Sequence, residues 1–91
     1  MIENKDAQEL VLNDVRNERI RQDRKWGDQV QNAHELWNVI GVEEVGEVAR
    51  AIYEAGEIDH LYLEIIQVAS VYVAWAESIR RRGEKYIEKH C

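Results

Sequence analysis

Hydrophobic residues recur every three or four positions in three stretches of the chain, and this period predicts three helices. In the first stretch Ala7, Val11 and Val15 are spaced four residues apart and share one face, while charged and polar residues occupy most of the remaining positions. The predicted helices cover about residues 5–25, 33–55 and 60–82. We therefore expect an all-α fold with three main helices.

Polar residues and glycines between these stretches predict where each helix begins and ends. Asn32 followed by Glu35 resembles a capping arrangement, with Asn32 as the N-cap of the second helix. Gly56 is expected to end that helix, and Asp59 to cap the next one. The short connection predicts that the second and third helices form an antiparallel hairpin. The third helix should end before Gly83, and the segment that follows, residues 84–91, adds one short helical piece.

The composition favours a single helical domain. The 91 residues include no proline and only five glycines, and 45% of them are apolar, so we expect one domain over residues 1–91. The formal net charge of −6 argues against binding a nucleic-acid polymer. No apolar run is long enough to span a membrane and no signal peptide is evident, so we expect a cytoplasmic protein without membrane partners.

Three glutamates interrupt the apolar pattern of the second helix. Its expected core face consists of Val42, Val45, Val48, Ala49 and Ile52. Glu44 and Glu47 lie at the margin of that face, whereas Glu43 lies on the polar side. Glu44 and Glu47 are therefore candidates for a site at the edge of the core, and Glu43 is their more exposed neighbour.

The third helix places Glu64 at the centre of an apolar face. Within about 60° of it around the helix lie Leu61, Val68, Val71, Trp75 and Ile79. His60 and Gln67 flank it at positions i−4 and i+3. Burying a lone carboxylate costs several kcal/mol unless a cation compensates its charge. A metal ion is one solution, and an arginine across an interface is another.

The hairpin brings the glutamates of the two helices within about one helical turn of each other. Oxygen ligands from Glu44, Glu47, Glu64 and Gln67 suit a hard cation such as Mg²⁺ that is shared with substrate phosphates, and no cysteine or histidine set favours zinc. The alternative is that these glutamates are ordinary helix formers on a solvated surface.

Two sequence stretches resemble the MazG-like family of all-α nucleoside triphosphate pyrophosphohydrolases. The first stretch is "EEVGEVARAI", and the second is "EIIQVASVYVAWAESI", which begins at Glu64, with sixteen residues between Glu47 and Glu64. The family motif is E-E-x-x-E followed at a distance by E-x-x-D. The upstream "ERIRQDRKWGDQ" is similar to short, phage-associated members. The resemblance implies Mg²⁺-dependent cleavage of nucleoside triphosphates, or of their deoxy forms, to a nucleoside monophosphate and pyrophosphate.

The resemblance also implies roles for individual residues. Glu44, Glu47 and Glu64 match metal ligands with catalytic roles, and Glu43 matches the leading glutamate. Gln67 stands where the family has an aspartate. A glutamine can coordinate Mg²⁺ or Mn²⁺ through its carbonyl oxygen, but it brings no charge and cannot act as a base. Whether the site hydrolyses a nucleotide or only holds one is left open by this departure.

Candidate substrate-binding residues lie on both sides of these motifs. Trp26 beside Lys25 suits stacking of a base and contact with a phosphate, although a tryptophan that closes the core is an equal alternative. Arg80 belongs to a run of three arginines that can meet phosphates or favour the end of the helix. The further candidates are Gln22 and His60.

The third helix is apolar nearly all round, so one protomer cannot cover it. We expect a homodimer in which two hairpins form a four-helix core, and the family resemblance also implies dimers or tetramers. Three functions follow for testing: a nucleotide pyrophosphohydrolase, a protein that sequesters a nucleotide or nucleotide signal, and a purely structural helical oligomer.

Overall fold

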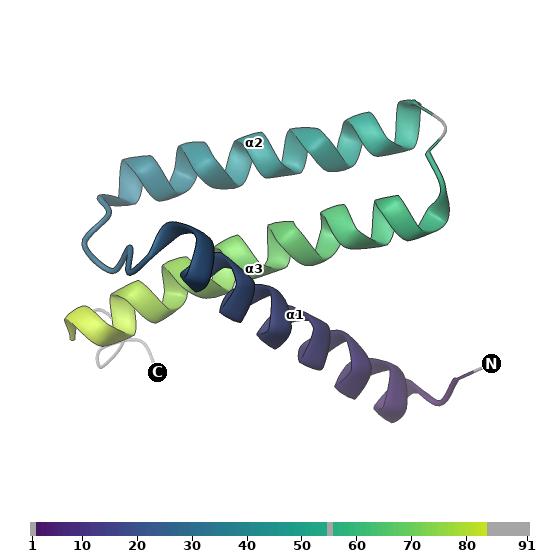
Figure 1. Cartoon of the computed structure of the whole chain (residues 1–91), viewed down its shortest axis with the longest axis horizontal. Helices are drawn as coiled ribbons and strands as arrows, with labels where there is room; N and C mark the ends of the chain where they lie inside the picture. The colour runs from purple at the N-terminus through teal and green to yellow at the C-terminus, as the bar shows by residue number, and fades with distance from the viewer. Residues whose placement is uncertain (1, 55, 84–91) are drawn as a thin grey trace.

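The chain folds into three helices with no strand among the residues described. The computed structural model describes residues 2–54 and 56–83. Its helices are α1 (Asn4–Trp26), α2 (His34–Tyr53) and α3 (Ile58–Arg82) (Figure 1). The predicted all-α fold and its three helices are confirmed. The short helical piece expected in residues 84–91 lies outside the described residues.

The prediction that Asn32 and Asp59 are the N-caps of α2 and α3 is wrong. The residues that precede these helices are Ala33 and Glu57, and neither helix start has a side-chain cap. Asn32 instead belongs to the preceding turn, where its backbone N–H donates to the carbonyl of Gln29 at 3.1 Å. Asp59 lies inside the first turn of α3, where a negative charge is favourable at a helix N-terminus.

The C-terminal ends of α2 and α3 differ in how well they match the prediction. α2 ends at Tyr53, and the residue that caps it is Glu54, two residues before the expected Gly56. α3 ends at Gly83 as predicted, and this glycine has a φ of 66° in the left-handed region that other residues adopt only with strain.

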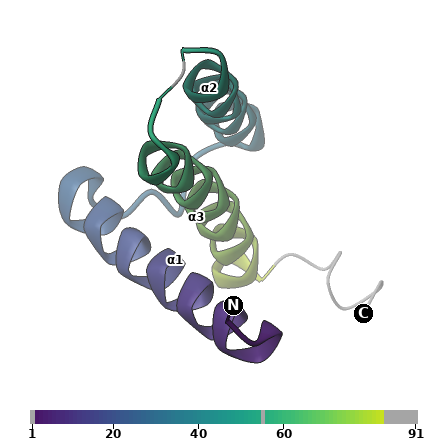
Figure 2. The ribbon, with the colours of Figure 1, turned by 90° about the vertical axis from the view of Figure 1, so that its right-hand side faces the viewer.

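α2 and α3 lie side by side and run in opposite directions, and α1 crosses α3 at an angle (Figure 1). In the view of Figure 2, α3 lies between α1 and α2. The N-terminal half of α1 extends away from the other two helices (Figure 1). Because only the later part of α1 is packed, Val15 is its one buried residue.

The core forms where α2 meets α3. Trp37, Val71 and Ala74 are buried together, and Ile40 and Trp75 pack against them. The helices approach closely beside this core, because a Cβ added to Gly41 would lie 2.7 Å from the hydroxyl oxygen of Tyr72. Glycine at this position therefore allows the tyrosine ring to pack against the backbone of α2.

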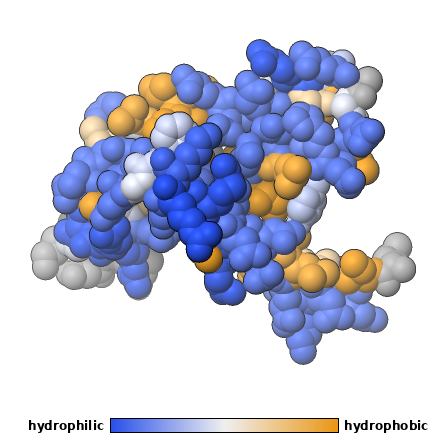
Figure 3. Space-filling model, in the orientation of Figure 1, coloured by the Kyte–Doolittle hydropathy of each residue, from blue (hydrophilic) through white to orange (hydrophobic). Residues whose placement is uncertain are grey.

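The apolar face expected to form the core of α2 is mostly exposed in the protomer. Val42 and Ile52 are 58% and 57% exposed, and Val45 and Ala49 are also exposed. α3 packs against a different face of α2, which carries Trp37, Gly41 and Ala51. The periodicity identified an apolar stripe but not which stripe is covered within one chain. Figure 3 shows hydrophobic residues on the visible surface over α2 and along the projecting end of α1.

Candidate functional site

A pocket of about 450 Å³ lies among the three helices, a size within the range of small-molecule sites. α1 contributes mainly charged and polar residues, α2 contributes carboxylates, and α3 contributes an amide and apolar residues. The lining residues are Glu18, Arg21, Gln22, Lys25, Trp26, Gln29, Trp37, Ile40, Glu43, Glu44, Gln67, Val71 and Ala74.

The pocket brings together six of the residues singled out from the sequence. These are Gln22, Lys25, Trp26, Glu43, Glu44 and Gln67. The other four do not line it: Glu47, Glu64, His60 and Arg80. The structure thus places the upstream segment of the chain opposite the glutamates of α2, which sequence spacing did not predict.

Glu44 lies among several other carboxylates. Partial burial raises its pKa, and the negative charges of Glu64, Glu47, Glu18 and Glu43 raise it further. Each of these carboxylates therefore lies within electrostatic range of Glu44. A cation bound among them would relieve this repulsion.

Glu64 occupies the partly buried position that its apolar face predicted. Its side chain is 15% exposed, and its Oε1 atom lies 3.8 Å from Nε2 of His60. Its Oε2 atom is buried and has no hydrogen-bond partner among the described residues. A buried carboxylate oxygen without a partner is costly, so this atom is suited to accept a cation or a donor from a ligand.

Glu47 is turned to a different partner. Its Oε1 atom lies 3.4 Å from Nη1 of Arg50, one turn along the same helix, and its side chain is 45% exposed. This is an ordinary surface ion pair, which contributes little to stability and can be exchanged.

The donors fit a hard divalent cation by their chemistry, because all of them offer carboxylate or amide oxygens. They do not yet fit it by spacing, since no group of three or more acidic, histidine or cysteine side chains in residues 2–54 and 56–83 is close enough to hold a metal ion. Glu47 is also engaged with Arg50.

α1 adds a carboxylate and a cation that the sequence interpretation missed. Glu18 and Arg21 form a two-bond fork, with Nε donating to Oε1 at 2.7 Å and Nη2 donating to Oε2 at 2.6 Å. Glu18 is 12% exposed in its side chain. The available signal was the spacing of Glu18, Arg21, Gln22 and Lys25 at three or four residues, which puts them on one face of a helix.

Trp26 is 59% exposed, so the alternative that it closes the core is wrong. The ammonium nitrogen of Lys25 lies 4.7 Å from the centre of the Trp26 ring, a cation–π contact at the mouth of the pocket. Trp37 is buried in the core and also lines the pocket.

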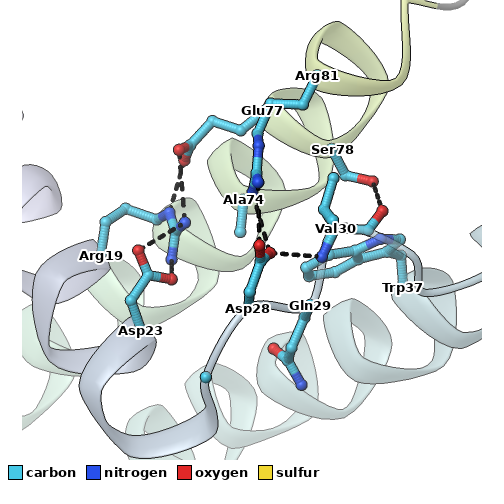
Figure 4. Close-up of a pocket in the computed structure, with 11 residues that line it drawn as sticks. Arg19, Asp23, Asp28, Gln29, Val30, Trp37, Ala74, Glu77, Ser78 and Arg81 are labelled. Carbon is cyan, nitrogen blue, oxygen red and sulfur yellow. Dashed lines mark hydrogen bonds and ion pairs between the residues drawn. The ribbon is translucent and has the colours of Figure 1, made fainter.

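A second, smaller hollow of about 250 Å³ lies on the other side of Trp37, between α1, the loop after it and α3 (Figure 4). Its charged residues pair with one another. Arg19 bridges Asp23 at 3.0 Å and Glu77 at 2.6 Å, and Arg81 donates to both carboxylate oxygens of Asp28 at 2.9 Å. The ion pairs around this hollow therefore have a structural role and hold the loop on α3.

The run of arginines at the end of α3 is directed mainly to that loop. Besides Arg81, Arg82 donates to the carbonyl of Asn32 at 3.4 Å. Arg80 is exposed and lines neither pocket. A contact of Arg80 with a ligand in the larger pocket is therefore not supported within one protomer.

None of the helices in the described part of the chain is long and apolar enough to cross a membrane. No protein-family model matches the chain, and no curated protein or solved structure matches it. The functional interpretation therefore depends on the residues of the pocket and on their geometry.

Proposed function

We propose that the chain is a Mg²⁺-dependent nucleoside triphosphate pyrophosphohydrolase of the MazG-like type, which releases a nucleoside monophosphate and pyrophosphate. The observation that carries this proposal is the pocket itself, in which carboxylates of α2 lie opposite the cations and the exposed tryptophan of α1. An anionic, aromatic ligand bound together with a divalent cation has the chemistry to match both walls.

The carboxylates of Glu44, Glu47 and Glu64 would hold the cation, with Glu43 and the amide of Gln67 beside them. The unpartnered Oε2 atom of Glu64 and the crowding of charge around Glu44 support this assignment. Mg²⁺, or Mn²⁺ in its place, supplies neutralisation of the phosphate charge when it is bound.

The protein side chains then orient the reactants. Glu44 or Glu47 positions a water molecule for in-line attack on a phosphate and accepts its proton, while the phosphoanhydride bond between the α and β phosphates breaks. Trp26 offers an exposed ring for stacking of the base, and Lys25 and Gln22 line the same wall. His60 and Arg80 lie outside the pocket, so no contact with the nucleotide is proposed for them.

We also propose that the protein acts as a homodimer or homotetramer. The exposed valines of α2 and further exposed apolar side chains of α3 support this proposal. The exposed members on α3 include Leu63, Ile65 and Val73. A second copy is the partner that would cover these faces without requiring another gene product.

A second function on the same pocket is retention of a nucleotide without turnover. Gln67 favours it, because an uncharged amide in the place of a carboxylate weakens metal affinity and cannot take a proton. The absence of a ready three-ligand group among the described residues points the same way.

One experiment separates the two functions. The protein is incubated with a panel of nucleoside and deoxynucleoside triphosphates and Mg²⁺ or Mn²⁺, and pyrophosphate release and ligand binding are measured together. The pyrophosphohydrolase is expected to release pyrophosphate, and Glu44→Gln and Glu64→Gln are each expected to lower the rate at least about 100-fold.

Glu35→Gln is the matched control, because Glu35 is an exposed residue of α2 outside the pocket. It should leave the rate unchanged. Tight binding without pyrophosphate release would reject hydrolysis and support retention of the nucleotide. If Gln67→Asp then restores release, the glutamine is the cause of the lost activity.

A further inference from the structure

The face of α1 that lines the pocket carries two cations. Glu18, Arg21, Gln22 and Lys25 are separated by three or four residues and all line the pocket. The opposite wall, on α2, is acidic. Without a cation between them, a phosphate chain would be repelled by that wall, so the protein groups that bind it directly are expected on α1.

Arg21 is held in place by Glu18. The fork between them has two hydrogen bonds of 2.7 and 2.6 Å, and it uses only part of the N–H groups of the guanidinium. The Glu18 side chain is largely buried, whereas that of Arg21 is half exposed at the pocket. A buried carboxylate therefore fixes the direction of an accessible guanidinium, which lowers the entropy cost of binding an anion.

Arg21 also lies within range of the acidic wall. Its hydrogen bonds to Glu18 raise its pKa, and the negative charge of Glu44 contributes. The guanidinium is thus between one carboxylate that orients it and a second one across the pocket. Lys25 is engaged with the ring of Trp26 at 4.7 Å, so the two cations of this face have different partners.

We infer that Arg21 binds the phosphate chain of the ligand and that Glu18 positions it. The remaining guanidinium N–H groups donate to non-bridging phosphate oxygens, and Lys25 adds a second positive charge toward the exposed tryptophan. The inference rests on the proposed function, because it takes the ligand to be a nucleoside triphosphate. It assigns the phosphate end of the ligand to α1.

The test measures binding by the change in tryptophan fluorescence, since two tryptophans line the pocket. Inorganic triphosphate and a nucleoside triphosphate are titrated with and without Mg²⁺. Arg21→Gln is expected to weaken binding of both ligands about tenfold or more. The affinity of Arg21→Lys should lie between that of the wild type and that of Arg21→Gln, because lysine keeps the charge but cannot form the fork.

Arg24→Gln is the matched control. Arg24 is exposed on the same helix, carries the same charge and does not line the pocket. Its replacement should leave affinity within about twofold of the wild type. Thermal unfolding of every variant shows that a loss of binding is not a loss of fold.

The role of Glu18 is tested by combining two substitutions. Glu18→Gln is expected to weaken triphosphate binding in the wild-type chain and to cause no further loss in the Arg21→Gln chain. A merely structural role would lower affinity in both backgrounds.

The outcomes separate this inference from the proposed hydrolysis. Wild-type affinity in Arg21→Gln would overturn the inference, even if the protein releases pyrophosphate. Binding that depends on Arg21 without any turnover would support the inference and reject the hydrolase. A wild-type protein that binds neither triphosphate would overturn both.

Discussion

Glu44 carries a charge that the folded protein disfavours. Its pKa is raised by partial burial and by four neighbouring glutamates, so folding favours its protonated form. A carboxylate with a raised pKa stabilises the fold fully only below its unfolded-state pKa, and this contribution is lost as the pH rises through the folded-state pKa. At neutral pH the ionised Glu44 is therefore a cost to stability.

Replacing Glu44 with glutamine should stabilise the fold at pH 7 in the absence of divalent cations. We expect a gain of less than about 1 kcal/mol in the free energy of unfolding, because partial exposure screens the charges. The gain should vanish at about pH 3, below the ordinary pKa of a glutamate, where Glu44 is protonated in both states. Urea denaturation of both proteins at the two pH values measures the difference.

Glu35→Gln provides the comparison for this effect. Glu35 is exposed in the first turn of α2, where a negative charge is favourable, so its removal should bring no gain. An equal stabilisation by both substitutions would show that net charge, and not the crowding at Glu44, is the cause.

At this scale the sequence predicted part of the pocket. Glu44 was identified because a carboxylate at the margin of an apolar face is conspicuous, and the same reasoning found the partly buried Glu64, which lies outside the pocket lining. Glu18 and Arg21 were not identified, because most positions of α1 are charged or polar and its apolar stripe is too thin to show which side faces the other helices. Their place in the site depends on how α1 crosses α3.

The loop between α1 and α2 is fixed to α3 by a buried serine. Ser78 is almost fully buried, and its hydroxyl donates to the carbonyl of Val30 at 2.7 Å. Ser78→Ala would leave that loop carbonyl without this donor, and we expect a loss of about 1 kcal/mol, or roughly 4–8 °C in Tm. Circular dichroism during heating measures the shift.

Ser70→Ala is a control for the loss of a buried hydroxyl. Ser70 is also fully buried, but its hydroxyl donates at 2.7 Å to the carbonyl of Ile66 and at 3.4 Å to that of Val15 in α1. In a helix, each of these carbonyls also accepts the backbone bond from the residue four positions later. The removal of Ser70 should therefore cost less than the removal of Ser78. The opposite order would contradict a special role of Ser78 in holding the loop.

Helix positions were predictable because the apolar period of each segment is a local property. The N-caps and the packed faces were not, although the glycine after α3 was. Asn32 and Asp59 have the composition of N-caps, yet the turn and the first helical turn use them differently. The packed face of α2 is decided by α3, where Tyr72 fits against Gly41, and no pattern within α2 records that partner.

In the part of the chain that the structure describes, many large apolar side chains of the three helices are exposed. If a second copy covers α2, the protein should migrate as a dimer or tetramer in light scattering coupled to size exclusion. Val45→Glu, on the exposed apolar face of α2, should shift it toward the monomer. A monomeric wild-type protein would reject the proposed assembly.

Asn13→Glu is the control for the added charge. Asn13 is an exposed polar residue on α1, so its substitution should leave the oligomeric state unchanged. Dissociation by both substitutions would indicate a general effect of net charge on association.

The division of the pocket between helices has an evolutionary consequence. The glutamates proposed to hold the cation belong to α2 and α3, whereas the cations and the exposed tryptophan belong to α1, which packs mainly against α3. Substitutions along one face of α1 can therefore alter which ligand is held while the carboxylates of the hairpin remain in place. A lineage built on this scaffold can change its ligand preference by drift in one helix, with the proposed cation ligands of the other two helices unchanged.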